Sequence, residues 1–235
     1  MDRIIKEIFV GKPKTVGDKN AKNPMDKEWE SAIFKKPVTG RVWVGKNGLD
    51  GDGQADLKNH GGPEKAIFAY PSEHYGYFHA EFDLTAMKAG GMGENLSLAN
   101  MLEDEVCIGD IYEIGEVVIQ VSQPRQPCWK PARRFKRKDL SLLIQDSGKT
   151  GWYFRVLKEG YVSAGQTPKL VDRPAPEWTI ENCNHVMHID RENKERAAAL
   201  AACEWLATSW KNTLNKRLEE GVSSNTGKRL YGANE

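Results

Sequence analysis

The stretch EVVIQVSQPRQPCWK, residues 116–130, indicates the fold because a strand pattern ends there in two prolines and a cysteine. Its first part is apolar and rich in β-branched residues, which is typical of a buried strand. The prolines cannot donate to a β-ladder, so the chain is expected to leave the sheet there. Cys128 therefore belongs at a sheet edge or at the mouth of a pocket, where Arg125 and Lys130 would favour its thiolate.

Short β-favouring runs recur over residues 1–173, including SAIFKK at 31–36. Two helices are expected among them, over residues 71–82 and 138–148. The segment EIGEV, residues 113–117, predicts a tight hairpin. Many short strands with few helices predict a mainly β fold with helices, of the α+β class, built on a mixed sheet or barrel. The pattern does not favour a doubly wound α/β fold.

The last quarter of the chain has a different composition. Closely spaced prolines in DRPAPEW, residues 172–178, indicate a linker. The helix-prone sequence after it predicts two or three helices over residues 177–221, which we call the helical appendage. Trp205 and Trp210 are expected to pack against the first part of the chain. Residues 222–235 show no periodicity and predict a loose tail.

The charge balance and the cysteine content indicate which partners and which cellular compartment to expect. The 235 residues include 34 Lys and Arg against 33 Asp and Glu, a net charge of +1. This balance gives no overall attraction to nucleic acid or to membranes, and neither is expected as a partner. No apolar stretch approaches the roughly 18 residues of a membrane span. Four cysteines without a CxxC pair predict reduced thiols, and with no signal peptide recognisable they indicate a cytoplasmic protein.

The loop KNGLDGDGQADLKNHGGPEKA, residues 46–66, contains five glycines and four acidic residues. A calcium loop beginning at Asp50 would need Gly and Glu where Ala55 and Gly61 stand, so that pattern fails. Neither of the common nucleotide-binding glycine spacings is present. Two interpretations stay open, a backbone cradle for an anion and a turn-rich surface loop.

Cys128 and His60 are the two residues with candidate catalytic chemistry. Cys128 could act as a nucleophile with His60 as its base, or its thiolate could be a soft ligand for a metal. His60 stands before a glycine pair that can bring the backbone close to a ligand, although a lone histidine is also commonly structural. Cys107 and Cys203 have the sequence context of small buried hydrophobic residues.

Two further motifs carry polar side chains that a ligand could use. Glu94 and Asn95 in GENL could bond a polar heterocycle or could close a turn with a solvated carboxylate. In GKTGWYFRV, residues 148–156, strand alternation places Arg155 on one face of the strand and Trp152 on the other. An arginine facing a cavity beside Thr150 would suit a phosphate, and the alternative is a solvent-facing arginine on an edge strand.

Four of these motifs stand in the order seen in MOSC domains, named for the C-terminal domain of molybdenum-cofactor sulfurase. They are the 46–66 loop, GENL, SQPRQPCWK and GKTGWYFRV. The chain resembles the YiiM-type members, which join a MOSC domain to a C-terminal three-helix region, over residues 5 to 220. The resemblance implies a barrel-like MOSC β-core over residues 1–173 and a three-helix region over 177–221.

The resemblance also implies a ligand, the molybdenum cofactor (molybdopterin), a pterin that carries a dithiolene and a phosphate. Cys128 would give a thiolate to molybdenum, and no candidate ligand lies beyond Pro176. A chain ending near Pro174 is therefore expected to keep the cofactor. The pterin cavity would be lined by Asn59, His60 and Gly61, and its polar edge or phosphate would be held by Arg125, Thr150 and Arg155.

The activity implied by the resemblance is reduction of N-hydroxylated compounds, such as 6-hydroxylaminopurine, from N–OH to N–H as a detoxification. The sequence has no flavin or nicotinamide fingerprint, so electrons would come from a partner reductase protein. The helical appendage could dock that partner or a second subunit of a homodimer. Two other functions stay open, a carrier of molybdenum cofactor or sulfur without turnover, and a metal-free cysteine hydrolase that uses His60.

Overall fold

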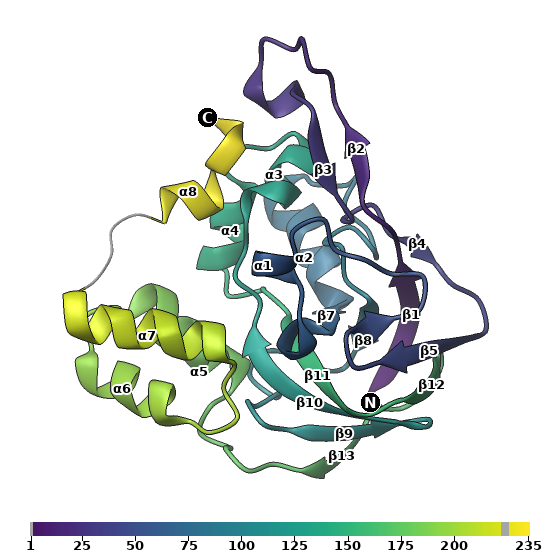
Figure 1. The fold of residues 1–235 in the computed structure, drawn as a ribbon, viewed down its shortest axis with the longest axis vertical. Coiled ribbons are helices and arrows are strands. Elements are labelled where there is room, and N and C mark those ends of the chain that lie inside the picture. Colours follow the sequence, from purple (N-terminus) through teal and green to yellow (C-terminus); the bar gives the residue numbers. More distant parts are fainter. Residues whose placement is uncertain (1, 222–225) are drawn as a thin grey trace.

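The computed structural model describes residues 2–221 and 226–235. Within these ranges an eight-stranded mixed sheet curves into a half-barrel, in the order β13-β9-β10-β11-β7-β8-β1-β4 (Figure 1). Its strands are β1 Ile4–Val10, β4 Lys36–Pro37, β7 Ile67–Pro71, β8 Leu96–Ala99, β9 Ile111–Ile114, β10 Val117–Pro124, β11 Trp152–Lys158 and β13 Lys169–Asp172. This confirms the α+β class with a barrel-like core.

Two smaller sheets accompany the half-barrel. One joins β12 Gly160–Ser163, β5 Arg41–Gly45 and β6 Gly48–Leu49. The other pairs β2 Lys14–Val16 with β3 Trp29–Ser31. The predicted run at 31–36 is wrong as a single strand, because the chain between β3 and β4 is not hydrogen-bonded in a ladder.

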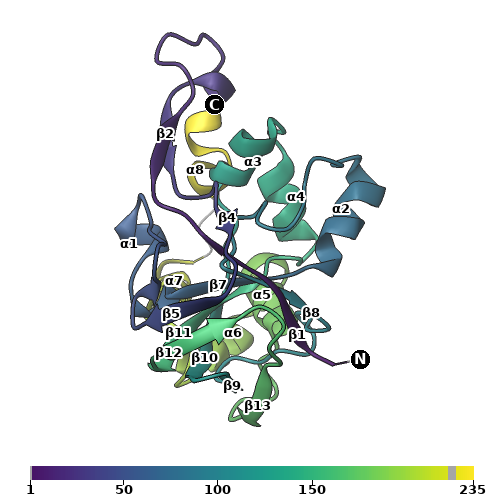
Figure 2. The ribbon, with the colours of Figure 1, turned by 90° about the vertical axis from the view of Figure 1, so that its right-hand side faces the viewer.

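The helices lie in two groups. At one end of the strands are α2 Glu73–Phe82, α3 Trp129–Phe135, α4 Leu140–Asp146 and α8 Gly227–Leu230 (Figure 2). Beside β10 are α5 Ile180–Asn184, the π-helix η3 His185–Ile189, α6 Lys194–Ala202 and α7 Thr208–Glu220 (Figure 1). Short elements are α1 Leu57–His60 and the 3₁₀ turns η1 Pro24–Asp26, η2 Pro63–Lys65 and η4 Gly232–Asn234.

The strand β10 explains how the sequence positions the site. It pairs with β9 through a hairpin whose turn is Gly115 at φ 58°, as the EIGEV pattern predicts. On its other side it pairs with β11 as far as Pro124, opposite Trp152. The ladder stops at that proline, so the following residues leave the sheet as expected.

The predicted helices at 71–82 and 138–148 are confirmed as α2 and α4. Ser72 precedes α2, and Gly148, at φ 69°, follows the end of α4. The sequence reasoning missed α3, which begins directly after Cys128.

The half-barrel and the helical appendage share one hydrophobic core. Among the described residues, one of the two clusters of buried side chains includes residues of both parts. In it Trp210 is 1% exposed, and Trp205 packs against the cluster. The predicted packing of the two tryptophans is therefore confirmed, with Trp210 buried and Trp205 half-buried. The residues that the appendage and linker contribute are Ala175, Trp178, Ile180, Cys183, Val186, Met187, Ala197, Leu200, Cys203, Leu206, Trp210 and Leu214. This continuity argues against the expectation that a chain ending near Pro174 would keep the site.

The predicted loose tail, residues 222–235, falls partly outside the described residues, which omit 222–225. For the remainder the prediction is wrong, because α8 and η4 are folded onto α3. Leu230 is 2% exposed and Asn234 is 3% exposed. The tail lacks helical periodicity because short elements of this kind depend on tertiary contacts.

No helix among the described residues has the length and apolar character needed to cross a membrane.

Candidate active site

Cys128 lies where a narrow cavity meets a wide groove. Its backbone is extended, at φ −118° and ψ 170°, immediately before the first residue of α3. The cavity has a volume of about 80 Å³ and the groove about 970 Å³. Cys128, His60 and Tyr153 line both spaces. The prediction that the strand end brings the thiol to the mouth of a pocket is confirmed.

The surroundings of Cys128 stabilise its thiolate. Burial alone would raise the pKa of the thiol. A hydrogen bond to His60, the charges of His60 and Arg125, and the backbone N–H of Lys130 outweigh burial and lower that pKa from 9.0 to about 6. His60 Nδ1 lies 3.6 Å from Asp56 Oδ2, a distance too long for a hydrogen bond, and among the described residues this buried nitrogen has no hydrogen-bond partner. This lowered pKa favours the thiolate form of Cys128 at neutral pH.

The other cysteines are in apolar surroundings. Burial raises the pKa of Cys107 to about 11 and also raises the pKa values of Cys183 and Cys203. All three are buried, in agreement with the small-hydrophobic interpretation of Cys107 and Cys203.

This contrast predicts that Cys128 is alkylated selectively, with a rate that rises with pH through a midpoint near 6. Because the folded-state pKa lies below the ordinary value, thiolate formation also stabilises the fold above pH 9, and this contribution is lost as pH falls through about 6. Iodoacetamide labelling followed by mass spectrometry gives the midpoint. His60→Ala should move it upward. A wild-type midpoint near 9 would contradict the assignment.

Arg125 supplies a buried cation to the same cavity. Its side chain is 5% exposed, and its guanidinium lies over the Phe68 ring at 5.1 Å from the centroid. Among the described residues its Nη1 has no hydrogen-bond partner. A buried guanidinium N–H is rarely left unpaired, so this donor is available to an anionic group in the cavity.

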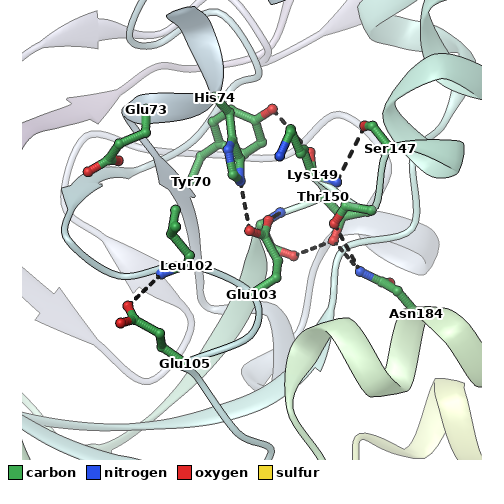
Figure 3. Close-up of polar contacts among 12 residues, drawn as sticks. Tyr70, Glu73, His74, Leu102, Glu103, Glu105, Ser147, Lys149, Thr150 and Asn184 are labelled. Carbon is green, nitrogen blue, oxygen red and sulfur yellow. Dashed lines mark hydrogen bonds and ion pairs between the residues drawn. The ribbon is translucent and has the colours of Figure 1, made fainter. Parts of the chain in front are cut away.

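A buried polar network fixes the backbone that carries Arg125. His74 of α2 and Glu103 point toward each other and are joined by a 2.7 Å hydrogen bond (Figure 3). Glu103 Oε1 accepts the N–H of Gly151 at 2.9 Å, and the Gly151 carbonyl accepts the N–H of Arg125 at 3.0 Å. The network therefore supports the cavity wall from behind.

Thr150 and Arg155 lie outside the residues that line the cavity and the groove. Thr150 is fully buried and its Oγ1 accepts Asn184 Nδ2 at 2.9 Å (Figure 3). Arg155 donates to Glu64 Oε1 at 3.2 Å and to the Trp205 carbonyl at 3.0 Å. Both residues connect the half-barrel to the helical appendage.

Glu64 completes that connection at the start of α7. Its two carboxylate oxygens accept the N–H of Thr208 at 3.1 and 3.0 Å. Its own carbonyl accepts Ser122 Oγ at 2.6 Å. The loop that carries His60 is thus attached both to β10 and to the helical appendage.

Asn59 and Gly61 are the sequence neighbours of His60, but neither lines the narrow cavity as His60 does. Asn59 lines the wide groove, and its Nδ2 donates to Asp56 Oδ2 at 2.8 Å. Gly61 ends α1 in extended backbone and is not among the lining residues of either space. The structure therefore brings together Cys128, His60, Arg125 and, at the groove, Asn59.

Other lining residues were not singled out as site residues from the sequence. Lys35 forms a buried ion pair with Asp52 at the cavity, and Tyr153 lies beside Cys128. Strand alternation in GWYFRV could have found Tyr153, whereas Lys35 belongs to no recognisable motif. In GENL, Asn95 lines the cavity. Glu94 instead accepts hydrogen bonds from Tyr75 Oη at 2.6 Å and from the N–H of Gly90 at 2.7 Å, so it closes a turn. Its carboxylate is fully buried, so the expectation of a solvated carboxylate at this turn is wrong.

Two protein-family models match the sequence of this chain. Residues 56–168 match the model for the MOSC domain, and residues 178–221 match the YiiM-like, 3-alpha helix domain. Protein YiiM of Escherichia coli is 39% identical over 204 residues, 86% of this chain and 91% of that protein. The chain belongs to the MOSC-domain family. It is of the YiiM type, with a MOSC core and a three-helix region, as the sequence motifs predict.

Solved structures agree with this membership. The crystal structure of YiiM from Geobacillus stearothermophilus is 38% identical, with a TM-score of 0.75 over 92% of this chain and 99% of that one.

A further sequence relative, a protein of Gibberella moniliformis called a reductase, is 38% identical over 169 residues, 71% of this chain and 30% of that protein. In this MOSC-domain chain the matched core includes Cys128, His60 and Arg125, whereas α8 and η4 lie beyond both models.

Proposed function

We propose that the protein is a molybdenum-cofactor-dependent reductase of N-hydroxylated compounds that receives electrons from a partner reductase protein. The observation that carries the proposal is a thiolate at the junction of a cavity and a groove, beside a buried arginine with an unpaired donor. MOSC domains in general are associated with the molybdenum cofactor. The relative called a reductase supports the redox class.

The residues present fit this cofactor better than a bare metal ion. Within residues 2–221 and 226–235 no three His, Cys, Asp or Glu side chains are grouped as a ligand set. The site offers one soft thiolate, which suits a metal that brings its own dithiolene ligand. The unpaired Arg125 Nη1 in the cavity suits the anionic end of such a cofactor.

The reaction adds two electrons and two protons to the N–OH group, breaks the N–O bond and releases water. When bound, the molybdenum cofactor supplies the two-electron redox chemistry. Cys128 would hold the metal and Arg125 the anionic end. The His60 side chain, 29% exposed and in contact with Cys128, can deliver a proton to the departing oxygen from the groove.

A metal-free cysteine hydrolase is the second candidate, because Cys128 and His60 line the same cavity and His60 lowers the pKa of the thiol, as a base does for a nucleophile. A carrier of the cofactor without turnover would use the same cavity. Molybdenum analysis of gently purified protein, with an N–OH reduction assay driven by a chemical electron donor, separates these functions. Molybdenum with turnover supports the reductase, molybdenum without turnover supports the carrier, and ester hydrolysis by the metal-free chain supports the hydrolase.

Arg125→Met should lower cofactor retention by roughly 10- to 100-fold, the usual range for groups that support a metal site. Stability of the metal-free chain should change by only about 1 kcal/mol, because the lost cation–π contact is offset by removal of an unpaired buried donor. Molybdenum content and thermal unfolding measure the two effects.

Arg155→Met is the matched comparison, because Arg155 is a partly buried arginine whose donors are paired. It should destabilise the fold by about 1–3 kcal/mol and leave molybdenum per folded chain unchanged. Loss of cofactor in Arg155→Met with full retention in Arg125→Met would reverse the assignment of the two arginines.

A further inference from the structure

The backbone on both sides of the Cys128 thiol is held by side chains. The carbonyl groups of residues 127–129 each accept a hydrogen bond from a different side chain. Arg229 Nη1 donates to the first, Ser141 Oγ donates to the second at 2.6 Å, and Asn234 Nδ2 donates to the third at 2.9 Å. Two of the three donors belong to residues 226–235, which we call the C-terminal clamp.

These bonds matter because no β-ladder holds the backbone of residues 127–129. The β10 ladder has ended at Pro124, and Cys128 precedes α3, so the thiol is carried by a link between two elements. A link of this kind without ladder bonds opens locally at low cost unless other contacts hold it. Arg229 also donates to Gln145 of α4, so it connects this link to a neighbouring helix.

The C-terminal clamp is itself firmly packed. Asn234 Oδ1 accepts Arg133 Nε at 2.7 Å, so this amide is bonded to α3 through both of its polar atoms. A Cβ on Gly232 would lie 2.4 Å from the Trp129 ring, which shows how closely the backbone lies on that side chain. Leu230 is buried. These contacts make residues 226–235 part of the support for α3.

We propose that the C-terminal clamp positions Cys128, with Arg229 and Asn234 as positioning residues for the chemistry at the thiol. The role of the thiol as a metal ligand rests on the proposed function, whereas the positioning itself rests on the three carbonyl contacts. Both family models end before the clamp, so neither the MOSC nor the three-helix match assigns it a role.

Hydrogen exchange of the metal-free, full-length protein tests the first positioning residue. Arg229→Gln should accelerate exchange of protected amides within residues 125–135 by roughly tenfold, because a bond from a charged donor to a buried carbonyl is lost. Arg217→Gln is the matched control. Arg217 donates to the Val186 and Met187 carbonyls at 2.8 Å each, so its exchange changes should fall at η3. Arg229→Lys should restore part of the protection.

Alkylation of Cys128 tests the second positioning residue without a change of charge. Asn234→Ala should raise the iodoacetamide rate at constant pH by roughly threefold or more, since the thiol segment opens more often. In molybdenum-loaded protein the same variant should lower kcat with little change in KM. Exchange and alkylation equal to wild type in folded Arg229→Gln and Asn234→Ala proteins would overturn the proposal. Absence of N–OH reduction would overturn the proposed function and leave the exchange result standing.

Discussion

Replacement of Cys128 by alanine is expected to abolish reduction of N-hydroxylated compounds while part of the molybdenum cofactor is retained. The change removes the thiolate that lines the cavity but leaves Arg125 and the other cations in place. Turnover should fall by roughly 100-fold or more, at or beyond the upper end of the effects seen when groups around a metal site are removed. Assays at equal molybdenum loading and the paramagnetic resonance spectrum of the metal measure the loss of activity and of the thiolate ligand.

Cys107→Ala and Cys203→Ala are the controls for this prediction. Both thiols are buried and their pKa values are raised, so neither is a candidate ligand. Each substitution should alter stability by about 1 kcal/mol and leave turnover intact. Wild-type turnover in Cys128→Ala at equal loading would show that the thiolate is not needed for the reaction.

A chain ending at residue 174 is expected not to fold cooperatively. It would lose the appendage side chains from a core shared with the half-barrel and expose the apolar surface of β10 that they cover. Trp210→Ala alone should cost about 3–5 kcal/mol, within the range for large buried side chains. Thermal unfolding followed by circular dichroism, with size-exclusion chromatography, measures both effects.

A chain ending at Gly221 is the matched control, because it retains α5, α6 and α7 and loses only the residues that follow. It should unfold cooperatively, although with a more mobile Cys128 segment. If the chain ending at residue 174 unfolds cooperatively near the full-length Tm, the half-barrel is independently stable. The shared core would then be an interface between two separate domains.

The elements that the sequence predicted well are those with a local signal. β10, its hairpin with β9, α2 and α4 each combine a periodic pattern with a defined start or stop. α3 was missed because Pro131 stands inside it. That proline occupies the first turn, where its missing N–H has no helical partner to lose. α8 has too few residues to show a period and is fixed by contacts with distant parts of the chain.

The sequence predicted the part of the site whose residues lie just beyond the end of strand β10. Arg125, Cys128 and the loop with His60 meet at the cavity as expected. Arg155 was assigned to the same cavity through the family resemblance, as a residue beside Thr150 that could hold a phosphate. It stands two residues, or about 7 Å, beyond Tyr153 along β11, where its guanidinium reaches the helical appendage instead. A strand pattern predicts the face of the sheet to which a side chain points, but it does not predict how far along the strand a cavity extends.

The bond between Glu64 and Thr208 has a consequence for recombination among members of this family. A chimaera spliced at the proline-rich linker would receive its third helix from another relative, while its histidine loop came from this chain. Glu64 would then need a backbone N–H in the same place on the incoming helix, together with a carbonyl for Arg155 where Trp205 now supplies one. A splice that misplaced those backbone groups would leave the partly exposed Glu64 and Arg155 side chains paired with each other but without their partners on the helical appendage. A chimaera would therefore have to preserve the backbone position of the start of α7, even though separate family models recognise the two segments.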